Sequence, residues 1–372
     1  MILHPFADFY RGKRVLVTGH TGFPGGWLVA WLKQLNAKIC GYSLPPATRP
    51  NFFDATVLDR GITSIFGDIR NGEVLANAFA EFQPEIVVHC AAQSLPERSL
   101  RDPVETFTTN VVGTVNVLEE ARMSTSVRAV VLATTNSCYE CGNSASGDRE
   151  HVVAGLNPLS ASASCAELAM SAYINSFFCK TKTGVASARC ANLIGGGEWA
   201  NARVIPELVR GIISRQPVVI SSNDSAESHW HVLDAARAYL LLAQRLYESD
   251  QTFAGSWDFG FENENIISAR QLAEKFIQLW GEGEFVVDGV VADKDSPPKP
   301  LRHLNAGRAR RLPDWMPALS LDDALAWTVE WYRAFYAEPS SAWRTTEDQI
   351  QRYTKMTGGQ HASTTQPERP AT

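Results

Sequence analysis

Short apolar segments alternate with longer segments of helical spacing along the first half of the chain. The short segments are rich in β-branched residues and have the length of strands, and they fall at residues 14–18, 38–42, 64–66, 86–90, 129–133 and 185–188. The longer segments place apolar residues three and four positions apart, which predicts helices at 25–35, 111–123 and 160–178. Strands that alternate with helices predict a parallel sheet covered by helices.

A glycine-rich turn joins the first expected strand to the first expected helix. Gly19, Gly22 and Gly25 follow the strand directly, in the spacing G-x-x-G-x-x-G. Glycines let the backbone turn tightly and approach a pyrophosphate, and the free N–H groups at the start of a helix attract its charge. The turn therefore predicts a bound dinucleotide, and an ordinary strand–helix turn is the alternative.

The end of the second strand bears on which dinucleotide is bound. An acidic residue at this position would bind the ribose 2′-hydroxyl and favour NAD, but Tyr42 and Ser43 stand there instead. Arg49 lies shortly after them, and a nearby arginine would favour NADP. The choice stays open, with NAD slightly favoured.

The pattern changes after about residue 195, where three glycines are followed by shorter elements and several prolines. We expect an α/β protein with a doubly wound parallel Rossmann sheet and a smaller C-terminal α/β substrate lobe. Residues 1–190 would form mainly the NAD(P)-binding domain, with part of 225–260 returning to it, and residues 191–345 mainly the lobe. An amphipathic helix is predicted at 321–336, and the polar composition of 346–372 predicts a disordered tail.

Composition narrows the possible partners. The chain has 372 residues, of which 45% are hydrophobic and 20% charged, with a net charge of −6. We therefore expect neither nucleic-acid nor membrane binding, and with no signal peptide or membrane-spanning run we expect a cytoplasmic protein. Seven irregularly spaced cysteines favour reduced thiols. Cys138 and Cys141 form a C-x-x-C without a second pair at zinc spacing, so no metal is expected.

Further motifs resemble the extended short-chain dehydrogenase/reductase superfamily. They are Gly67-Asp68-Ile69 after the third strand, Cys90-Ala91-Ala92-Gln93 after the fourth, and the helix that begins Asn110-Val111-Val112-Gly113-Thr114. Several stretches look like the CDP-glucose 4,6-dehydratases of bacterial deoxysugar pathways, and this resemblance covers roughly residues 8–338. Those stretches are residues 11–23, 41–46, 138–140, 165–168, 192–200 and 231–234.

The resemblance implies a Rossmann domain with bound NAD(P), a sugar-nucleotide pocket in the C-terminal lobe, and a homodimer. The implied cofactor-binding residues are Gly19, Thr21, Gly22, Phe23, Pro24, Gly25, Asp68, Ile69, Ala91, Ala92, Gln93, Asn110 and Thr134. The implied substrate-binding residues are Ser94, Asn192, Arg203, Glu227 and His231.

The chain departs from this family at the groups that carry its chemistry. Family dehydratases oxidise C4 of the sugar, remove water across C5–C6 and return the hydride to C6, using a Tyr-x-x-x-Lys pair and an Asp-Lys pair. Leu159 and Ala163 stand in place of the first pair, and Asn136 and Ser137 in place of the second. Leu and Ala do not titrate, an amide is no acid at neutral pH, and each lost acid or base is worth about 10²–10⁴ in rate. The parent activity is therefore expected to be lost.

The substrate side departs as well, because Glu227 stands where family members carry an arginine that meets a nucleotide phosphate. A carboxylate there repels a diphosphate, so CDP-glucose is disfavoured as substrate. The candidates for new chemistry are Tyr139 near the end of the fifth strand, Ser137, Thr135 and Asn136 beside it, and the titratable His229. Further candidates with less support are Cys141, Cys190, Glu198 and Glu227.

Three functions remain open from the sequence. The first is a repurposed biosynthetic enzyme of lyase, isomerase or cyclase type acting on a small sugar-like or other pathway metabolite, with NAD(P) kept without redox turnover. The second is an inactive pseudoenzyme that partners or regulates an active homologue. The third is CDP-glucose 4,6-dehydratase activity.

Overall fold

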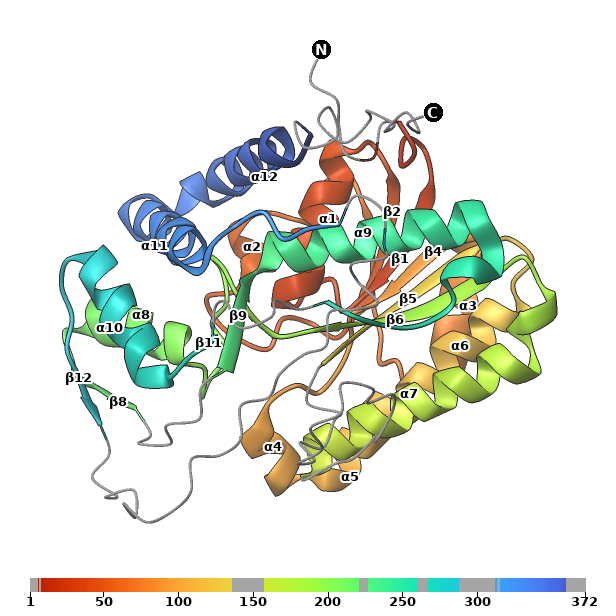
Figure 1. The fold of residues 1–372 in the computed structure, drawn as a ribbon, viewed down its shortest axis with the longest axis horizontal. Helices are drawn as coiled ribbons and strands as arrows, with labels where there is room; N and C mark the ends of the chain where they lie inside the picture. Colours follow the sequence, from red (N-terminus) through yellow and green to blue (C-terminus); the bar gives the residue numbers. More distant parts are fainter. Residues whose placement is uncertain are drawn as a thin grey trace, which may run out of the picture.

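The computed structural model describes residues 6, 8–135, 157–220, 227–259, 266–287, 312 and 315–358. Its centre is a seven-stranded parallel sheet in the order β10-β6-β5-β4-β1-β2-β3 (Figure 1). The strands are β1 (Arg14–Thr18), β2 (Lys38–Ser43), β3 (Thr63–Phe66), β4 (Ile86–His89), β5 (Ala129–Thr135), β6 (Gly184–Cys190) and β10 (Gly255–Asp258). The six strands expected from the apolar pattern are confirmed, and β10 is an addition to them.

Helices cover both faces of this sheet, so the strands bury side chains on both sides. Val15 and Val17 of β1 face a core shared with α1 (Phe23–Gln34) and α9 (Val232–Ser249), while Leu16 faces a second core. The second core is closed by α3 (Gly72–Phe82), α6 (Gly113–Met123) and α7 (Pro158–Ser176). The shorter helices are α2 (Phe52–Ala55), α4 (Pro96–Arg101) and α5 (Pro103–Phe107), with 3-10 turns at Phe178–Lys180, Asp250–Phe253 and Pro339–Ser341.

The strand order predicts a ligand crevice beyond the carboxyl ends of β1 and β4. β1 pairs with β2 on one side and with β4 on the other, so the chain winds outward in both directions from this point. In doubly wound sheets the crevice beyond the carboxyl ends of such strands is where ligands bind. The glycine turn follows β1 and the loop from Cys90 to Gln93 follows β4, so both motifs open onto the same crevice.

The later elements build smaller sheets beside the main one. They are β7 (Asn192–Ile194), β9 (Glu227–His231) and β11 (Ile266–Ile267) in one sheet, β8 (Val218–Ile220) and β12 (Phe285–Val287) in another, and the helices α8 (Val204–Ser214) and α10 (Ala269–Trp280). β9 runs directly into α9, which packs on β5 and β6 of the main sheet. The lobe is therefore joined to the sheet domain by continuous chain, and its predicted limits stay a prediction.

The C-terminal part corrects the expectation of a disordered tail. The predicted helix at 321–336 is confirmed as α11 (Leu321–Ala337), but a further helix, α12 (Ala342–Gly358), follows it and packs on α1 and α11. Its polar residues turn inward and bond: Thr346 accepts from the indole of Trp331 at 2.8 Å, and Gln349 donates to the carbonyl of Trp327 at 2.8 Å. The prediction is wrong for residues 346–358, and residues 359–372 lie outside the described part.

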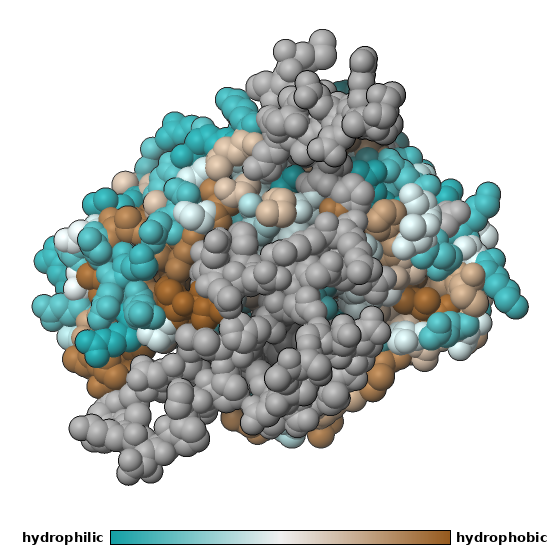
Figure 2. Space-filling model, viewed as in Figure 1, coloured by the Kyte–Doolittle hydropathy of each residue, from teal (hydrophilic) through white to brown (hydrophobic). Residues whose placement is uncertain are grey.

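The surface in this view is mixed. Figure 2 shows hydrophilic residues over most of the described face, with apolar patches between them. Strands β8 and β12 contribute the exposed valines 219, 286 and 287. Among the described residues, no helix combines the length and apolar composition needed to cross a membrane.

Candidate active site

The turn after β1 accepts only glycine at two of its positions. Gly19 has φ +75°, and a Cβ there would lie 2.7 Å from the backbone nitrogen of Ala91. A Cβ on Gly25 would lie 2.3 Å from the carbonyl oxygen of Gly19. The bare backbone therefore closes on itself and on the loop after β4, directly at the start of α1. This is the cradle that a dinucleotide pyrophosphate needs, so the residues present fit the implied cofactor.

The hydroxyl groups of Thr21 and Ser43 lie together at the end of β2. The Thr21 hydroxyl lies 2.8 Å from the Ser43 hydroxyl and donates to the carbonyl of Leu44 at 2.8 Å. Pro24 occupies the first turn of α1 and has no N–H to offer to a phosphate. Since no acidic residue lies within Tyr42–Pro46, the geometry leaves the choice between NAD and NADP open.

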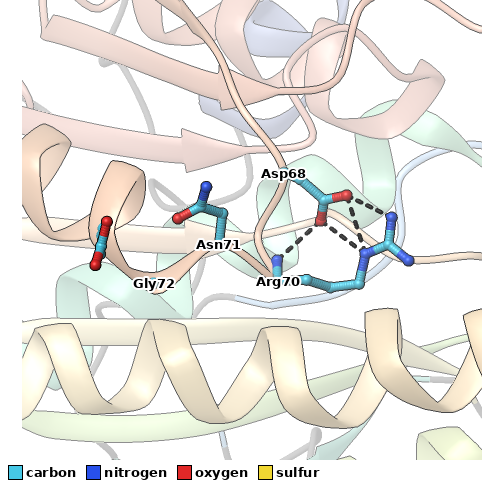
Figure 3. A pocket seen from close by; sticks show the side chains of 5 residues that line it. Asp68, Arg70, Asn71 and Gly72 are labelled. Atoms are coloured by element: carbon cyan, nitrogen blue, oxygen red, sulfur yellow. Dashed lines mark hydrogen bonds and ion pairs between the residues drawn. The ribbon is translucent and has the colours of Figure 1, made fainter.

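An ion pair lies at the rim where the resemblance places the adenine. Figure 3 shows Asp68 and Arg70 beside a shallow pocket that Asn71, Gly72 and Glu73 also line. Asp68 accepts from the backbone nitrogen of Arg70 at 2.8 Å and from its guanidinium at 2.5 Å. The hydrogen bonds from Arg70 lower the pKa of the Asp68 carboxyl. Asp68 is therefore held ionised and oriented, and Ile69 is buried beside it, where a Cβ on Gly113 would lie 2.5 Å from its side chain.

Asn110 fixes the loop after β4. It lies in a single π-helical turn (Thr108–Val112) that precedes α6, so the predicted helix at 111–123 begins in a turn of a different type. Its side chain accepts from the backbone nitrogen of Gln93 at 2.8 Å and donates to the carbonyl of Gln93 at 3.0 Å. It also donates to the hydroxyl of Ser162 at 2.9 Å. Asn110 thus ties this loop to the first turns of α7, and such π-turns are frequent at functional sites.

One face of α7 carries Leu159 and Ala163, the positions at which the resemblance leads us to expect the Tyr-x-x-x-Lys pair of the family. Leu159, Ala163 and Glu167 are spaced four residues apart, which puts them on the same stripe of the helix. Leu159 and Ala163 are half-buried, and Ser162 between them donates to the carbonyl of Leu159 at 2.8 Å. The stripe therefore places two half-buried apolar side chains beside Ser162, to which the Asn110 side chain is bonded.

Glu167 is a buried carboxylate that the sequence analysis missed. One oxygen accepts from the hydroxyl of Thr134 at 2.7 Å and from Arg189 Nε at 3.0 Å. The other accepts from the hydroxyls of Ser187 and Ser256 at 2.7 and 2.8 Å and from a second Arg189 nitrogen at 3.0 Å. Burial raises the pKa of Glu167, and the three hydroxyls partly offset this. The sequence did contain one signal for this carboxylate: Arg189 lies inside an apolar strand, and a buried charge needs a partner of opposite sign.

The hydrogen bonds to Glu167 also fix the side chain of Thr134. Its hydroxyl is directed to Glu167, so it braces β5 against α7. Thr135 is the last residue of β5. The candidates Asn136, Ser137 and Tyr139, like Cys138 and Cys141, lie outside the described residues.

Four of the expected substrate-binding residues come together beside the crevice. The amide of Asn192 donates to the carboxylate of Glu227 at 2.6 Å. The guanidinium of Arg203 lies 3.5 Å from the Asn192 amide oxygen and 3.3 Å from the carbonyl of Ser94. Residues from the loop after β4, from β7, from the start of α8 and from β9 thus form one linked polar cluster. Glu227 thus engages one N–H of the Asn192 amide.

Glu198 and His229 lie next to this cluster. The carboxyl of Glu198 is 3.9 Å from Arg203 Nε, and burial raises its pKa to about 7, while Arg203 and Arg210 act to lower it. His229 is buried, with its Nδ1 at 3.0 Å from the carbonyl of Glu227, and burial lowers its pKa. The cluster therefore contains a carboxyl that can change its charge near neutral pH.

Two other candidates, His231 and Cys190, are buried. His231 is fully buried between the rings of Trp27 and Trp327, and burial lowers its pKa to about 3. Its surroundings are those of a packing residue, which speaks against direct contact with a substrate. Burial likewise raises the pKa of Cys190 to about 12, so this thiol is no nucleophile at neutral pH.

Comparisons with known proteins agree with this geometry. A family model described as the NAD dependent epimerase/dehydratase family matches residues 15–253. The CDP-glucose 4,6-dehydratase of Salmonella typhimurium is 38% identical over 337 residues, which cover 88% of this chain and 92% of that protein.

Solved structures share the fold. The dTDP-glucose 4,6-dehydratase of Bacillus anthracis in complex with NAD has a TM-score of 0.70 at 23% identity, with 90% of this chain and 100% of that chain covered. The UDP-glucose 4-epimerase of Thermotoga maritima with UDP-glucose has a TM-score of 0.69 at 20% identity, with 86% and 99% covered. The chain therefore belongs to the NAD dependent epimerase/dehydratase family, within the extended short-chain dehydrogenases/reductases.

Proposed function

We propose that this protein binds NAD(P) and a sugar-like metabolite and acts on it as a lyase, isomerase or cyclase without the parent redox cycle. One contrast carries the proposal. The cradle at Gly19 and Gly25 excludes any side chain and is intact, whereas the α7 stripe beside Asn110 presents Leu159 and Ala163. The cofactor site is thus kept while the position of the usual base is apolar.

Hydride transfer from an alcohol needs a base to take its proton. Leu159 and Ala163 cannot do so, and Glu167 on the same stripe already receives five hydrogen bonds. NAD(P), when bound, supplies hydride chemistry in this fold. In this chain it would serve mainly to complete the pocket wall and position the substrate.

The polar cluster on the substrate side supports an altered ligand. Arg203 brings a positive charge next to Asn192 and Ser94. Glu227 adds a carboxylate that accepts a hydrogen bond from Asn192. A diphosphate next to this carboxylate is disfavoured. Glu198, whose pKa of about 7 suits proton transfer at neutral pH, is the candidate acid or base beside Arg203.

The proposal is tested with the purified full chain in two steps. Denaturation followed by chromatography should release NAD(H) or NADP(H), and a chain that neither carries nor binds either dinucleotide contradicts the cofactor assignment. Incubation with CDP-glucose should give no 4-keto product. Robust turnover would instead establish the CDP-glucose 4,6-dehydratase alternative.

A restored variant provides the positive control for that assay. It changes the four positions at which acid–base groups are missing, through Leu159→Tyr, Ala163→Lys, Asn136→Asp and Ser137→Lys. It also carries Glu227→Arg, which replaces the carboxylate that disfavours a diphosphate. Turnover by this variant but not by the natural chain assigns the lost activity to these positions and shows that the scaffold still holds the sugar nucleotide.

The pseudoenzyme alternative rests on the same apolar stripe, because loss of a base is also what a non-catalytic partner would show. Purification from the native source distinguishes it: a homologue with an intact Tyr-x-x-x-Lys pair would co-purify in a stoichiometric ratio. A metabolite that co-purifies with the isolated chain favours the enzyme instead.

The homodimer is part of the same proposal. The mutually packed helices α4, α5 and α7 expose Leu100, Val104 and Leu168, with 69%, 72% and 58% of their surface accessible. A second copy laid on this face would bury them. Sedimentation of the natural chain and of a Val104→Glu variant tests it, since a dimer through this face should dissociate in the variant.

A further inference from the structure

A buried imidazole at the end of β4 lies between β1 and α6. His89 is the last residue of β4 and only 5% of it is exposed. Its Nδ1 lies 2.6 Å from the hydroxyl of Thr18, which ends β1. Its Nε2 lies 3.1 Å from the hydroxyl of Thr114 in α6. Both ring nitrogens are therefore engaged by hydroxyl groups, and His89 acts through these two hydroxyls.

The hydrogen positions in this series of hydrogen bonds follow from counting the donors. Thr114 donates its single hydroxyl hydrogen to the carbonyl of Asn110 at 2.6 Å, so it can only accept from His89, whose Nε2 must carry a proton. The backbone N–H of Ala91 donates to the Thr18 hydroxyl at 3.2 Å, and Thr18 is then free to donate to Nδ1. A single direction satisfies every group: from Ala91 through Thr18 to His89, and from His89 through Thr114 to Asn110.

Burial supports the neutral ring that this direction requires. It lowers the pKa of His89 to about 4, so the imidazole is uncharged at neutral pH. A charged ring would present a second N–H to Thr18, and the hydroxyl hydrogen of Thr18 would lose the acceptor that the described residues provide.

The loop after β4 is held at both ends by this arrangement. Ala91 is bound by Thr18 at one end, and Gln93 is bound by the Asn110 side chain at the other. The Asn110 carbonyl is where the chain through His89 ends. The same loop packs on Gly19, where a Cβ would collide with Ala91. The glycine turn, the loop and the π-helical turn therefore share one set of hydrogen bonds.

We infer that His89, neutral and protonated on Nε2, is a positioning residue that locks the Ala91–Gln93 loop and the Asn110 turn together in the shape that receives the cofactor. It touches neither cofactor nor substrate, and its effect passes through Thr18 and Thr114. The link to the cofactor rests on the proposed NAD(P) site, whereas the proton arrangement does not.

The first test uses the full chain without added cofactor. Nitrogen NMR of the imidazole, assigned by the signal missing in His89→Gln, should show the neutral Nε2–H form. Hydrogen exchange of the Ala91 amide should accelerate at least about tenfold in Thr114→Val, although Thr114 does not bond Ala91. Thr328→Val is the matched control, because it removes a buried hydroxyl in α11 whose partner among the described residues is a carbonyl of the same helix. An Nδ1–H ring, or an Ala91 amide that responds equally in both variants or in neither, overturns the inference.

The second test measures binding of NADH and NADPH by fluorescence. Thr18→Val should weaken binding about tenfold or more, and Thr18→Ser, which keeps the hydroxyl, should restore it. Equal losses in Thr18→Val and Thr328→Val would reduce the role of Thr18 to general stability and overturn the link to the cofactor. If the natural chain binds neither dinucleotide, the proposed function fails, while the exchange and NMR results still decide the proton arrangement.

Discussion

The phenol of Tyr353 in α12 donates a 2.6 Å hydrogen bond to the carboxylate of Asp234 in α9, and both side chains are buried. The same carboxylate oxygen accepts from the backbone nitrogen of Ala318 at 2.7 Å. Tyr353 also packs edge-on against Trp31 of α1 at 5.4 Å between ring centroids. One pair of residues thus fastens the last described helix to the helices that cover the main sheet.

Removal of the Tyr353 hydroxyl should therefore lower the stability of the whole domain. Tyr353→Phe keeps the ring against Trp31 but leaves Asp234 with one donor fewer, and a buried hydrogen bond to a charged group is worth about 1.5–3 kcal/mol. Denaturant unfolding should show a loss of this order. Lys355→Ala, an exposed change in the same helix, is the control and should stay within about 0.5 kcal/mol. Equal stability of Tyr353→Phe and the natural chain would show that α12 is not anchored through this bond.

Asp234 should also make stability depend on pH. Burial raises its pKa in the folded protein to about 6 from an ordinary value of 3.8. Between these values the unfolded chain has lost a proton that the folded chain keeps, so the free energy of unfolding falls as pH rises through this window. Asp234→Asn cannot titrate and should show a flatter curve, which urea unfolding at several pH values measures. Parallel curves for the two proteins would contradict the raised pKa.

The buried pair of Glu167 and Arg189 gives the largest expected effect. Glu167→Ala leaves Arg189 without its main partner and removes the acceptor of three hydroxyls, and breaking such a pair costs about 3–5 kcal/mol. Ser256→Ala removes only one donor from the same carboxylate and should cost about 1.5–3 kcal/mol, the value for one hydrogen bond to a charged group. Thermal and denaturant unfolding of both variants should rank them in this order. A Glu167→Ala protein as stable as Ser256→Ala would show that the charge pair contributes little.

Sequence reasoning located the sheet because its signal is local. The buried strands are continuous apolar runs, and the glycine turn has a fixed spacing between a strand and a helix, so both can be recognised from neighbouring residues. The cluster of Ser94, Asn192, Arg203 and Glu227 was predicted from the family resemblance alone. Its members lie up to 133 residues apart in the sequence, so no local pattern connects them.

The parts that were missed depend on long-range contacts. Helix α12 has a polar composition, and its inward Thr346, Gln349 and Tyr353 bond to residues of α9 and α11. Its Ala342 and Ile350 are buried in the core, and neither kind of contact is visible in the local sequence. Glu167 is satisfied by side chains from β5, β6 and β10, and no local pattern reveals which strands will meet it. His89 reads as one polar residue at the end of a strand until Thr18 and Thr114 are placed beside it.

Gly19 and Gly12 both have a positive φ near the first strand, so Gly12 provides the control for a test of Gly19 in the cofactor cradle. Gly12 has φ +72°, and a Cβ added there would have nothing within 4 Å, whereas at Gly19, with φ +75°, a Cβ would collide with the backbone of Ala91. Both alanine variants carry the same backbone strain, and only Gly19→Ala adds the collision. NADH and NADPH titrations should show binding weakened at least about tenfold further in Gly19→Ala than in Gly12→Ala. Similar affinities would remove this turn from the cofactor site.

Glu227 provides the test of the substrate side. Its carboxylate occupies the Asn192 amide at 2.6 Å, next to the Arg203 guanidinium that bonds Ser94 and Asn192. Replacing it by arginine reverses a charge and frees Asn192, so Glu227→Arg should gain affinity for CDP by about tenfold or more, an effect that added salt should weaken. Glu227→Gln removes the charge without reversing it and should give a smaller gain. Calorimetric titration with CDP measures all three proteins. If the natural chain already binds CDP as tightly as Glu227→Arg does, the carboxylate does not exclude a diphosphate, and a sugar nucleotide becomes the ligand that best fits the cluster.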